Sequence, residues 1–245
     1  MTATIMSDII KFSNFSKVKG LIHGFSTRKF GNIRPNQPDR DQAMELFCKD
    51  LNISQTYLVT MQQVHGVNVE EVTREQRGWR ILQTDGLITQ SKETYLSVLA
   101  ADCMPILIYD KVKNKAGAVH AGWKGVYSQI IKEAIKQLEL LGSESKDIIV
   151  GIGPCIRSCC YNVPKERAEK FKRKFKDYTN FLSNKDGREF LDLPSLAKQQ
   201  LLDVGISREN IEDCGLCTYD NHDLLYSSRK EGENFGEFIG IIGMR

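Results

Sequence analysis

Short apolar runs separated by turn-forming residues dominate the first half of the chain. Most of these runs are rich in β-branched and aromatic residues, which is typical of β-strands. The turns between them are short, so we expect largely antiparallel pairing and not a strict alternation of strand and helix. The predicted strands are 57–61, 67–72, 86–90, 95–101, 105–110 and 117–121, followed later by 147–154, 223–229 and 236–244.

Helical periodicity appears between these strand candidates. Asp39 is a candidate N-cap for a helix that ends near residue 51, and Asp192, with Pro194 in the first turn, opens a helix over 193–205. Another helix is predicted over 126–138 before Gly142, and a basic one over 165–177. Their apolar stripes are Ala43, Met44, Phe47 and Leu51; Val126, Ile130, Ile131, Ala134, Ile135 and Leu138; and Ala168, Phe171 and Phe175.

The order of these elements predicts an α/β (α+β) fold in which helices cover mixed sheets. The segment 24–41, which contains Gly, Pro and Asn, is expected to be a long loop. No internal repeat, low-complexity tract or long linker divides the chain. We therefore interpret residues 1–245 as one domain, with residues 1–19 as an N-terminal lead-in.

Composition narrows the class of protein. Hydrophobic residues make up 41% and charged residues 27% of the 245 positions, which is typical of a soluble globular protein. The formal charge of +3 is too small to indicate a nucleic-acid partner, and no apolar run is long enough to span a membrane. The N-terminus lacks the pattern of a secretory signal, so we expect a cytoplasmic protein. Seven cysteines, an odd number, are interpreted as reduced thiols.

Polar residues interrupt two of the predicted strands. Asp102 and Cys103 lie inside the run "LSVLAADCMPILIYD", and His120 lies inside "GAVHA". Cys103 can be a small buried side chain, a nucleophile or a metal ligand, and a single histidine is often a hydrogen-bonded core residue. Together with His65, the pair Cys103 and His120 forms an acceptable three-ligand set for Zn²⁺ with one position open. Their spacing along the chain matches no short ligand motif.

Five other cysteines form a rival candidate. Cys155, Cys159 and Cys160 lie in "PCIRSCC", and Cys214 and Cys217 lie in "CGLC". The C-x3-C pair of Cys155 and Cys159 and the C-x2-C pair of Cys214 and Cys217 can close an all-cysteine zinc site if the two segments meet. The C-x-x-C pair can also be redox active. Neither segment has the turns that usually position paired thiolates, so the preferred interpretation is five inert thiols.

Several basic and hydroxyl residues lie in glycine-rich surroundings. Arg28 and Lys124, like Arg229, have side chains suited to phosphate or ribose oxygens, and Ser26 precedes Arg28 in "GFSTR". The alternative for each of the three cations is an ordinary surface charge. No P-loop and no dinucleotide-binding glycine motif occurs in the chain.

These segments resemble one family when they are taken together. "QVHGVNV", "DGLIT", "LAADCMPILIYD", "GAVHAGWKG", "GIGPCI" and "LLYSSRKEG" occur in the order typical of the laccase-domain family, over residues 20–245. That family is also called multicopper-polyphenol-oxidase-like and peptidoglycan-editing-factor-like. It is associated with zinc-containing purine nucleoside phosphorylases that also deaminate adenosine.

The resemblance implies a fold and a site. The implied fold is a single αβ sandwich of two sheets flanked by helices, similar to the catalytic domain of a deamidating toxin. The implied metal ligands are His65, Cys103 and His120, with zinc as the metal and copper as the alternative. Asp102 is expected to orient a ligand or to carry a proton. The expected substrate contacts are Ser26, Arg28, Gln63, Lys124 and Arg229.

The implied reactions are phosphorolysis of adenosine, inosine, guanosine and methylthioadenosine, and hydrolytic deamination of adenosine. The expected partners are therefore purine nucleosides and phosphate. The sequence departs from the family pattern in the loop after "GFSTR", which is shorter here, and at Lys124, where the family more often has arginine.

Two other functions stay open. In a cysteine hydrolase or deamidase, for example one acting on peptidoglycan precursors, Cys103 is the nucleophile and His120 its base. The third alternative is a metal-binding module without catalytic activity. A copper laccase is disfavoured because four histidines are too few for the ligands of a multicopper oxidase.

Overall fold

Two large sheets form the centre of the protein in the computed structural model, which describes residues 4–6 and 8–245. The first sheet has the order β1 (Thr4–Met6), β2 (Ile9–Lys11), β3 (Leu21–Phe25), β16 (Phe238–Met244), β8 (Tyr95–Ala100), β4 (Leu58–Met61) and β6 (Arg80–Ile81). The second has the order β15 (Ile211–Asp213), β11 (Ile148–Ile152), β9 (Met104–Asp110), β10 (Lys115–Ala121), β7 (Gly86–Thr89) and β5 (Val69–Glu71).

Pairing within the sheets is mixed. Most central pairs, such as β9 with β10 and β8 with β16, are antiparallel, whereas β4 with β8 and β5 with β7 are parallel. The helices are α1 (Ser13–Ser16), α2 (Arg40–Asp50), α3 (Trp123–Tyr127), α4 (Ile130–Leu140), α5 (Lys165–Lys174), α6 (Leu193–Asp203) and α7 (Ser228–Glu231). Mixed sheets flanked by helices confirm the predicted fold class.

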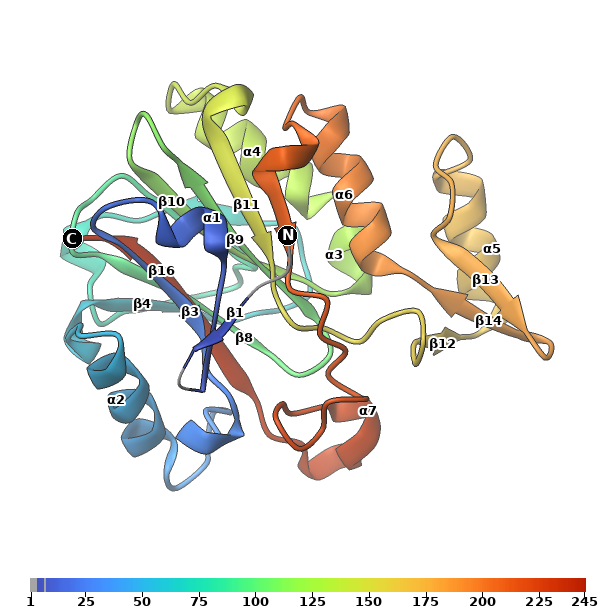
Figure 1. Ribbon diagram of the computed structural model, residues 1–245, viewed down its shortest axis with the longest axis horizontal. Coiled ribbons are helices and arrows are strands. Elements are labelled where there is room, and N and C mark those ends of the chain that lie inside the picture. The colour runs from blue at the N-terminus through green and yellow to red at the C-terminus, as the bar shows by residue number, and fades with distance from the viewer. Residues whose placement is uncertain (1–3, 7) are drawn as a thin grey trace.

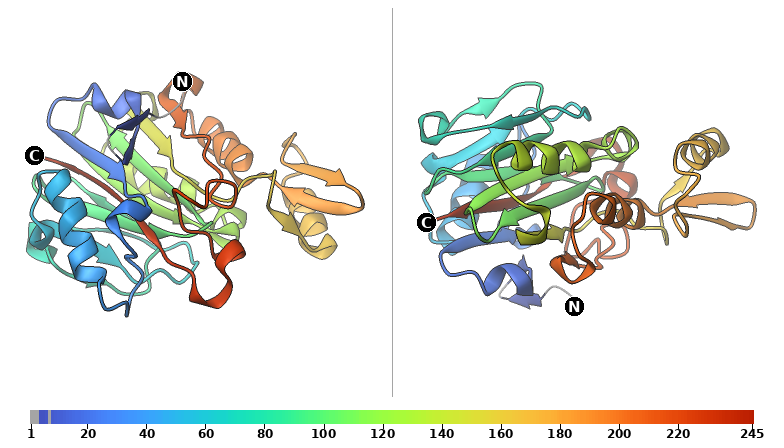
Figure 2. Two further views of the ribbon diagram at one scale, coloured as in Figure 1. Left: turned by 60° about the horizontal axis from the view of Figure 1, so that its bottom comes forward. Right: turned by 90° about the horizontal axis from the view of Figure 1, so that it is seen from above.

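Among the described residues the core has three parts because each large sheet is apolar on both faces. Alternate residues of β9 point to opposite sides, so Leu107 packs between the two sheets while Ile106 packs under α4 and α6. On the outer face of the first sheet, Phe47 of α2 packs against Tyr95 of β8. The result is a sandwich of four layers, helix, sheet, sheet and helix (Figures 1 and 2).

A small lobe protrudes from this sandwich. It contains α5 and a three-stranded sheet of β12 (Asn162–Val163), β14 (Arg188–Leu191) and β13 (Leu182–Lys185). Figures 1 and 2 show α5, β13 and β14 to one side of the main body. The predicted basic helix is confirmed here as α5, with Ala168 and Phe171 buried.

The N-terminal lead-in packs onto the sandwich where it is described. Residues 1–3 and 7 of the expected lead-in 1–19 lie outside the described residues. In the rest of it, β2 pairs with β3, and Phe12 and Phe15 are fully buried in the core between the two sheets.

Three local predictions differ from the structure or are only partly met. The strand predicted over 223–229 is wrong: the segment forms turns and then α7, because its polar groups bind the carboxylates of Asp102 and Glu231. The helix predicted over 126–138 is broken between α3 and α4 at Gln129, which has a φ of 67°. Asp39 is the N-cap of α2 but makes no capping hydrogen bond, whereas the side chain of Asp192 accepts one from Ser195 N at 3.0 Å.

None of the helices in the described part of the chain has the length and apolar content needed to cross a bilayer.

Candidate metal centre

Strand register brings Cys103 and His120 to the same end of the second sheet. His120 lies opposite Pro105 in the antiparallel pair of β10 and β9, and Cys103 immediately precedes β9. His120 is on the same face of β10 as Ala116 and Ala118, which is the face turned toward the first sheet. His65 comes from the loop between β4 and β5.

The three predicted ligands converge. Their donor atoms all lie within 4.8 Å of one another, and Cys103 Sγ is 3.7 Å from His65 Nε2. The rings of His65 and His120 meet edge to face, with 4.8 Å between centroids. His120 is buried, Cys103 is partly exposed and His65 is exposed, so the group opens to solvent on one side.

Asp85, which immediately precedes β7, organises two of these ligands. One of its carboxylate oxygens accepts hydrogen bonds from His120 Nδ1 at 2.8 Å and from the backbone N–H of His65 at 2.9 Å. The other accepts from the N–H groups of Val64 and Gly66 at 3.1 and 2.7 Å. The loop therefore curls around one carboxylate, which holds His65 at its unusual φ of 61°. Since Nδ1 of His120 is occupied, its Nε2 is left to bind a metal.

Electrostatics favour charged forms of the cysteine and the buried histidine. Burial alone would raise the pKa of the Cys103 thiol, but His120 and then His65 lower this pKa to about 6. Burial would lower the pKa of His120, but the Cys103 thiolate and the Asp85 carboxylate raise it to about 9. Burial likewise opposes ionisation of Asp85, whereas its hydrogen bonds from His120 and Gly66 lower its pKa. A thiolate is the form of cysteine that binds metals and attacks electrophiles.

The donor set fits a zinc ion. Two imidazoles and one thiolate are borderline-soft ligands, and three protein ligands with an open fourth position are typical of catalytic zinc. Gly122 leaves room for this arrangement, because a Cβ there would lie 2.9 Å from His65 Cδ2 and 3.0 Å from Cys103 Sγ. A side chain after β10 would displace His65 or Cys103, so glycine at this position lets the ligands approach each other. The same donors suit copper, which stays the alternative.

The open side of the group faces a cavity of about 950 Å³. The cavity is bounded by α2, β4, β6, β8 and the segment that leads into β16. Three arginines, Arg34, Arg40 and Arg80, line it together with Glu237. Burial raises the pKa of Glu237, although His120 and Arg34 oppose the shift. The cavity therefore combines cationic groups with a carboxyl group of raised pKa.

The carboxylate of Asp102 is held by hydrogen bonds from three other residues. It lies at a φ of 84°, and its carboxylate accepts hydrogen bonds from Thr218 Oγ1, Ser228 Oγ and Arg229 N at 2.6, 2.8 and 2.7 Å. These contacts hold the chain immediately before Cys103 against the segment around α7. The predicted catalytic role of Asp102 stays a prediction.

The five residues expected to contact the substrate lie in different parts of the structure. Gln63 lines the cavity, and its amide bonds both the N–H and the C=O of Leu99 at 2.8 and 2.9 Å. Ser26 is fully buried and bonds the N–H of Ile239. Arg28 binds Glu231, His222 and the carbonyl of Leu225, and stacks on Tyr226.

Lys124 and Arg229 are exposed and do not belong to the cavity lining. Lys124 Nζ lies 5.8 Å from the Trp123 ring, and Arg229 bonds the Asn162 side chain at 2.7 Å. Only Gln63 among the five expected contacts therefore shares the cavity with the metal ligands, and the contact roles stay predictions.

Sequence reasoning missed Asp85 and the cavity arginines. Asp85 directly precedes a predicted strand in "DGLIT". A carboxylate next to a buried strand needs hydrogen-bond partners, and this is the signal that could have identified it. Arg34 and Arg40 belong to the loop 24–41 and the start of α2, where they look like ordinary surface charges. Nothing local to these residues indicates that they meet Arg80 across a cavity.

Fold and site together define a class of protein: a helix–sheet–sheet–helix sandwich with a His–Cys–His group that opens into a cavity. A family model described as "Multi-copper polyphenol oxidoreductase laccase" matches residues 24–245. The chain belongs to this laccase-like family, as the resemblance of its segments predicted.

Named relatives and solved structures agree with this assignment. The purine nucleoside phosphorylase YlmD of Bacillus subtilis is 32% identical over 250 residues, which cover 93% of this chain and 90% of the relative. A purine nucleoside phosphorylase of Clostridium acetobutylicum is 34% identical over 66% of this chain and 67% of its own length.

The crystal structure of the hypothetical protein YfiH of Bacillus licheniformis has a TM-score of 0.89 and 25% identity, over 99% of both chains. YlmD from Geobacillus stearothermophilus shares the fold at the same TM-score, with 24% identity over 97% of this chain and 96% of its own.

Proposed function

We propose that the protein is a zinc-dependent purine nucleoside phosphorylase that also deaminates adenosine. The observation that carries the proposal is the three-donor group of His65, Cys103 and His120, open to a cavity that arginines line. Relatives named purine nucleoside phosphorylase support the reaction. The proposed substrates are adenosine, inosine, guanosine and methylthioadenosine, with phosphate as the second substrate.

A zinc ion held by His65, Cys103 and His120 would supply Lewis-acid chemistry, including activation of a water molecule for attack on purine C6. The chain's own contribution is to hold three donors in place. Asp85 fixes the ring of His120 through Nδ1 and the position of His65 through the backbone. The donors are already gathered to within 4.8 Å of one another, so metal binding requires local side-chain shifts and the loss of the His120 proton.

We assign the anionic substrate to the cavity arginines. Arg40 is notable because its Nε is buried and has no hydrogen-bond partner among the described residues. An unpaired buried donor costs free energy, which a phosphate oxygen would recover. Arg34 is held by the carbonyls of Glu233 and Phe235 and stacks on the ring of Phe235, and Arg80 is exposed at the rim. Arg28, Lys124 and Arg229, the cations expected from the sequence, lie outside this lining.

Glu237 is the group we assign to proton transfer. It lines the same cavity, and burial raises the pKa of its carboxyl group, which favours the protonated form relative to an exposed glutamate. Phosphorolysis requires a proton for the departing purine, and deamination requires one for the departing ammonia. One carboxyl group at the cavity wall serves either reaction.

The proposal takes residues 1–245 as one domain, since residues from Arg34 to Glu237 line the same cavity. It places the protein in the cytoplasm, where free thiols such as Cys103 stay reduced.

A direct assay tests the function. Purified protein, with its metal content measured, is incubated separately with adenosine, inosine, guanosine and methylthioadenosine, each in the presence and absence of phosphate. From adenosine, adenine is expected only with phosphate. Inosine is expected without phosphate, and inosine together with its phosphorolysis product hypoxanthine is expected with phosphate. No turnover of any of the four nucleosides by zinc-loaded protein would overturn the proposal.

The Arg40→Gln variant tests the phosphate site. Loss of one charge-assisted hydrogen bond of about 1.5–3 kcal/mol should raise the KM for phosphate by about tenfold or more. Phosphorolysis should lose more than deamination, because only phosphorolysis uses phosphate. Arg173→Gln, at an exposed position of α5, is the matched control. Equal losses in both reactions would show that Arg40 does not bind phosphate.

One observation favours a second function, a cysteine hydrolase or deamidase. Cys103, His120 and Asp85 stand in the order of a nucleophile, a base and an orienting carboxylate, and the thiol pKa is lowered to about 6. In this alternative, chelators leave activity intact while iodoacetamide removes it from metal-free protein. Loss of activity on chelation, and its return with zinc, would exclude it.

A further inference from the structure

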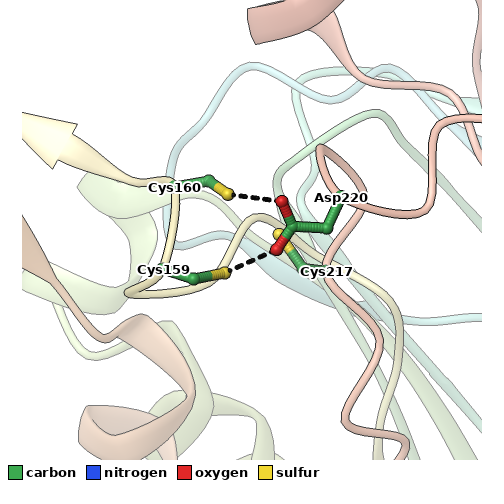
Figure 3. A group of neighbouring side chains, drawn as sticks. All are labelled: Cys159, Cys160, Cys217 and Asp220. Carbon is green, nitrogen blue, oxygen red and sulfur yellow. Dashed lines mark hydrogen bonds between the residues drawn. The ribbon is translucent and has the colours of Figure 1, made fainter.

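A second group of soft donors lies away from the His65–Cys103–His120 site. It consists of Cys159, Cys160, Cys217 and Asp220, whose donor atoms all lie within 4.8 Å of one another. Cys159 and Cys160 occupy the turn between β11 and β12, and Cys217 and Asp220 follow β15. Figure 3 shows the four side chains pointing toward a common centre.

Contacts within the group are already formed. The thiol of Cys159 donates to one carboxylate oxygen of Asp220 at 3.0 Å, and the thiol of Cys160 donates to the other at 3.0 Å (Figure 3). Cys217 is buried, whereas Cys159 and Asp220 are exposed. A carboxylate that faces three thiols has weak donors as partners, and a cation would satisfy all four groups better.

The backbone holds the two segments in register. Cys155 and Cys217 form a parallel bridge, in which Cys155 N donates to Leu216 O at 3.3 Å and Thr218 N donates to Cys155 O at 3.1 Å. In the first segment, Cys160 N donates a hydrogen bond to Arg157 O at 2.9 Å. In the second segment, Asn221 N donates one to Cys217 O at 2.9 Å. The four donors are therefore gathered by hydrogen bonds that do not involve their side chains.

We propose that Cys159, Cys160, Cys217 and Asp220 form a second, structural zinc site. Three sulfurs and one oxygen make the closed four-ligand set that structural zinc prefers. With Zn–S bonds of about 2.3 Å, tetrahedral sulfurs stand about 3.8 Å apart, so closing the site requires shifts of about 1 Å. Binding releases the three thiol protons to solvent, and no electrons are transferred. Lys230, whose Nζ bonds Tyr219 O at 3.2 Å, carries a positive charge that acts on Asp220 and offsets part of the negative charge.

This site differs from the all-cysteine site that the sequence allowed. Cys155 and Cys214 are buried within two separate apolar clusters, and neither belongs to the group. Asp220 takes the fourth position instead. Three of the five cysteines interpreted as inert thiols therefore have a role in this proposal.

The position of the site indicates what it does. It joins the turn that leads into the protruding lobe to the segment 214–221, and Thr218 of that segment donates to the carboxylate of Asp102. Asp102 immediately precedes Cys103. A zinc ion here would fasten the base of the lobe and support the chain that presents Cys103.

Metal counting tests the proposal on the full chain. Protein stripped with a chelator and kept reduced is reloaded with Zn²⁺ or Co²⁺, and the metal is counted by native mass spectrometry. About two equivalents are expected in the unaltered protein. The double variant His65→Ala/His120→Ala should keep one equivalent, with the thiolate-to-cobalt charge-transfer band of a sulfur-rich site. The double variant Cys159→Ser/Cys160→Ser should also keep one, but with a much weaker band.

Two aspartate variants provide a matched comparison. Asp220→Asn should weaken the second equivalent by at least tenfold, whereas Asp223→Asn, three residues away and also exposed, should leave it unchanged. One equivalent in the unaltered protein, lost completely in His65→Ala/His120→Ala, would overturn the proposal. So would a Cys159–Cys160 disulfide, detected by mass spectrometry, in protein purified without reductant.

Discussion

Replacing Cys103 by serine is expected to remove the zinc ion held with His65 and His120 and to reduce adenosine turnover by about a thousandfold or more. A serine hydroxyl is a poor zinc ligand near neutral pH, whereas the Cys103 thiol, with its pKa of about 6, supplies a thiolate. Loss of Lewis-acid stabilisation worth several kcal/mol corresponds to about three or more powers of ten in rate. Metal content, measured beside turnover, should fall by one equivalent.

The metal measurement separates the two roles of Cys103. A nucleophilic cysteine also loses activity on substitution, but full zinc content in Cys103→Ser, together with activity that resists chelators, would contradict the ligand role. Cys48→Ala is the matched control, because Cys48 is a buried free thiol of α2 that belongs to neither metal group. We expect it to keep both turnover and metal.

Replacing Asp85 by asparagine is expected to weaken both the metal site and the fold. The carboxamide NH₂ cannot accept a hydrogen bond, so the N–H groups of Val64 and Gly66 would lose their acceptor. Unpaired buried groups and a weakened contact to His120 should cost about 3 kcal/mol, which corresponds to a decrease in Tm of about 6–12 °C. Zinc affinity should fall by about 10–100-fold because the loop of His65 and the ring of His120 lose their anchor.

The decrease in Tm should persist in metal-free protein, since the hydrogen bonds of Asp85 do not depend on a metal. Thermal unfolding with and without chelator measures this, and a zinc titration gives the affinity. Asp177→Asn, at an exposed position, is the control. If Asp85→Asn bound zinc within twofold of the unaltered protein, Asp85 would not position the ligands.

Local patterns predicted most of the central elements. The apolar stripe of Ala43, Met44 and Phe47 became the buried face of α2, and Asp192 with Pro194 opened α6 as expected. The strand predicted over residues 223–229 is wrong because their side-chain and backbone donors find acceptors at distant positions such as Asp102. Periodicity reports the burial of an element, and it contains no information about such partners.

The metal ligands likewise combine features that the sequence predicted with features that only the structure shows. Residue type and resemblance singled out His65, Cys103 and His120, while their spacing alone left packing, nucleophile and ligand roles open. The structure supplied the reason they can act together, which is the register of β9 and β10 and the carboxylate of Asp85 behind them.

By itself, the amino-acid sequence determined the fold class, the family and the three candidate ligands, because periodicity, caps and motif residues are encoded over short stretches of chain. Only the tertiary structure decided which charges share the cavity: Arg40 and Arg80 line it, whereas Arg28 pairs with Glu231 elsewhere. Only the tertiary structure likewise brought Asp220 to Cys159 and Cys160, about 60 residues away in sequence. Such meetings depend on how sheets and loops pack over long distances in sequence, and no local pattern contains that information.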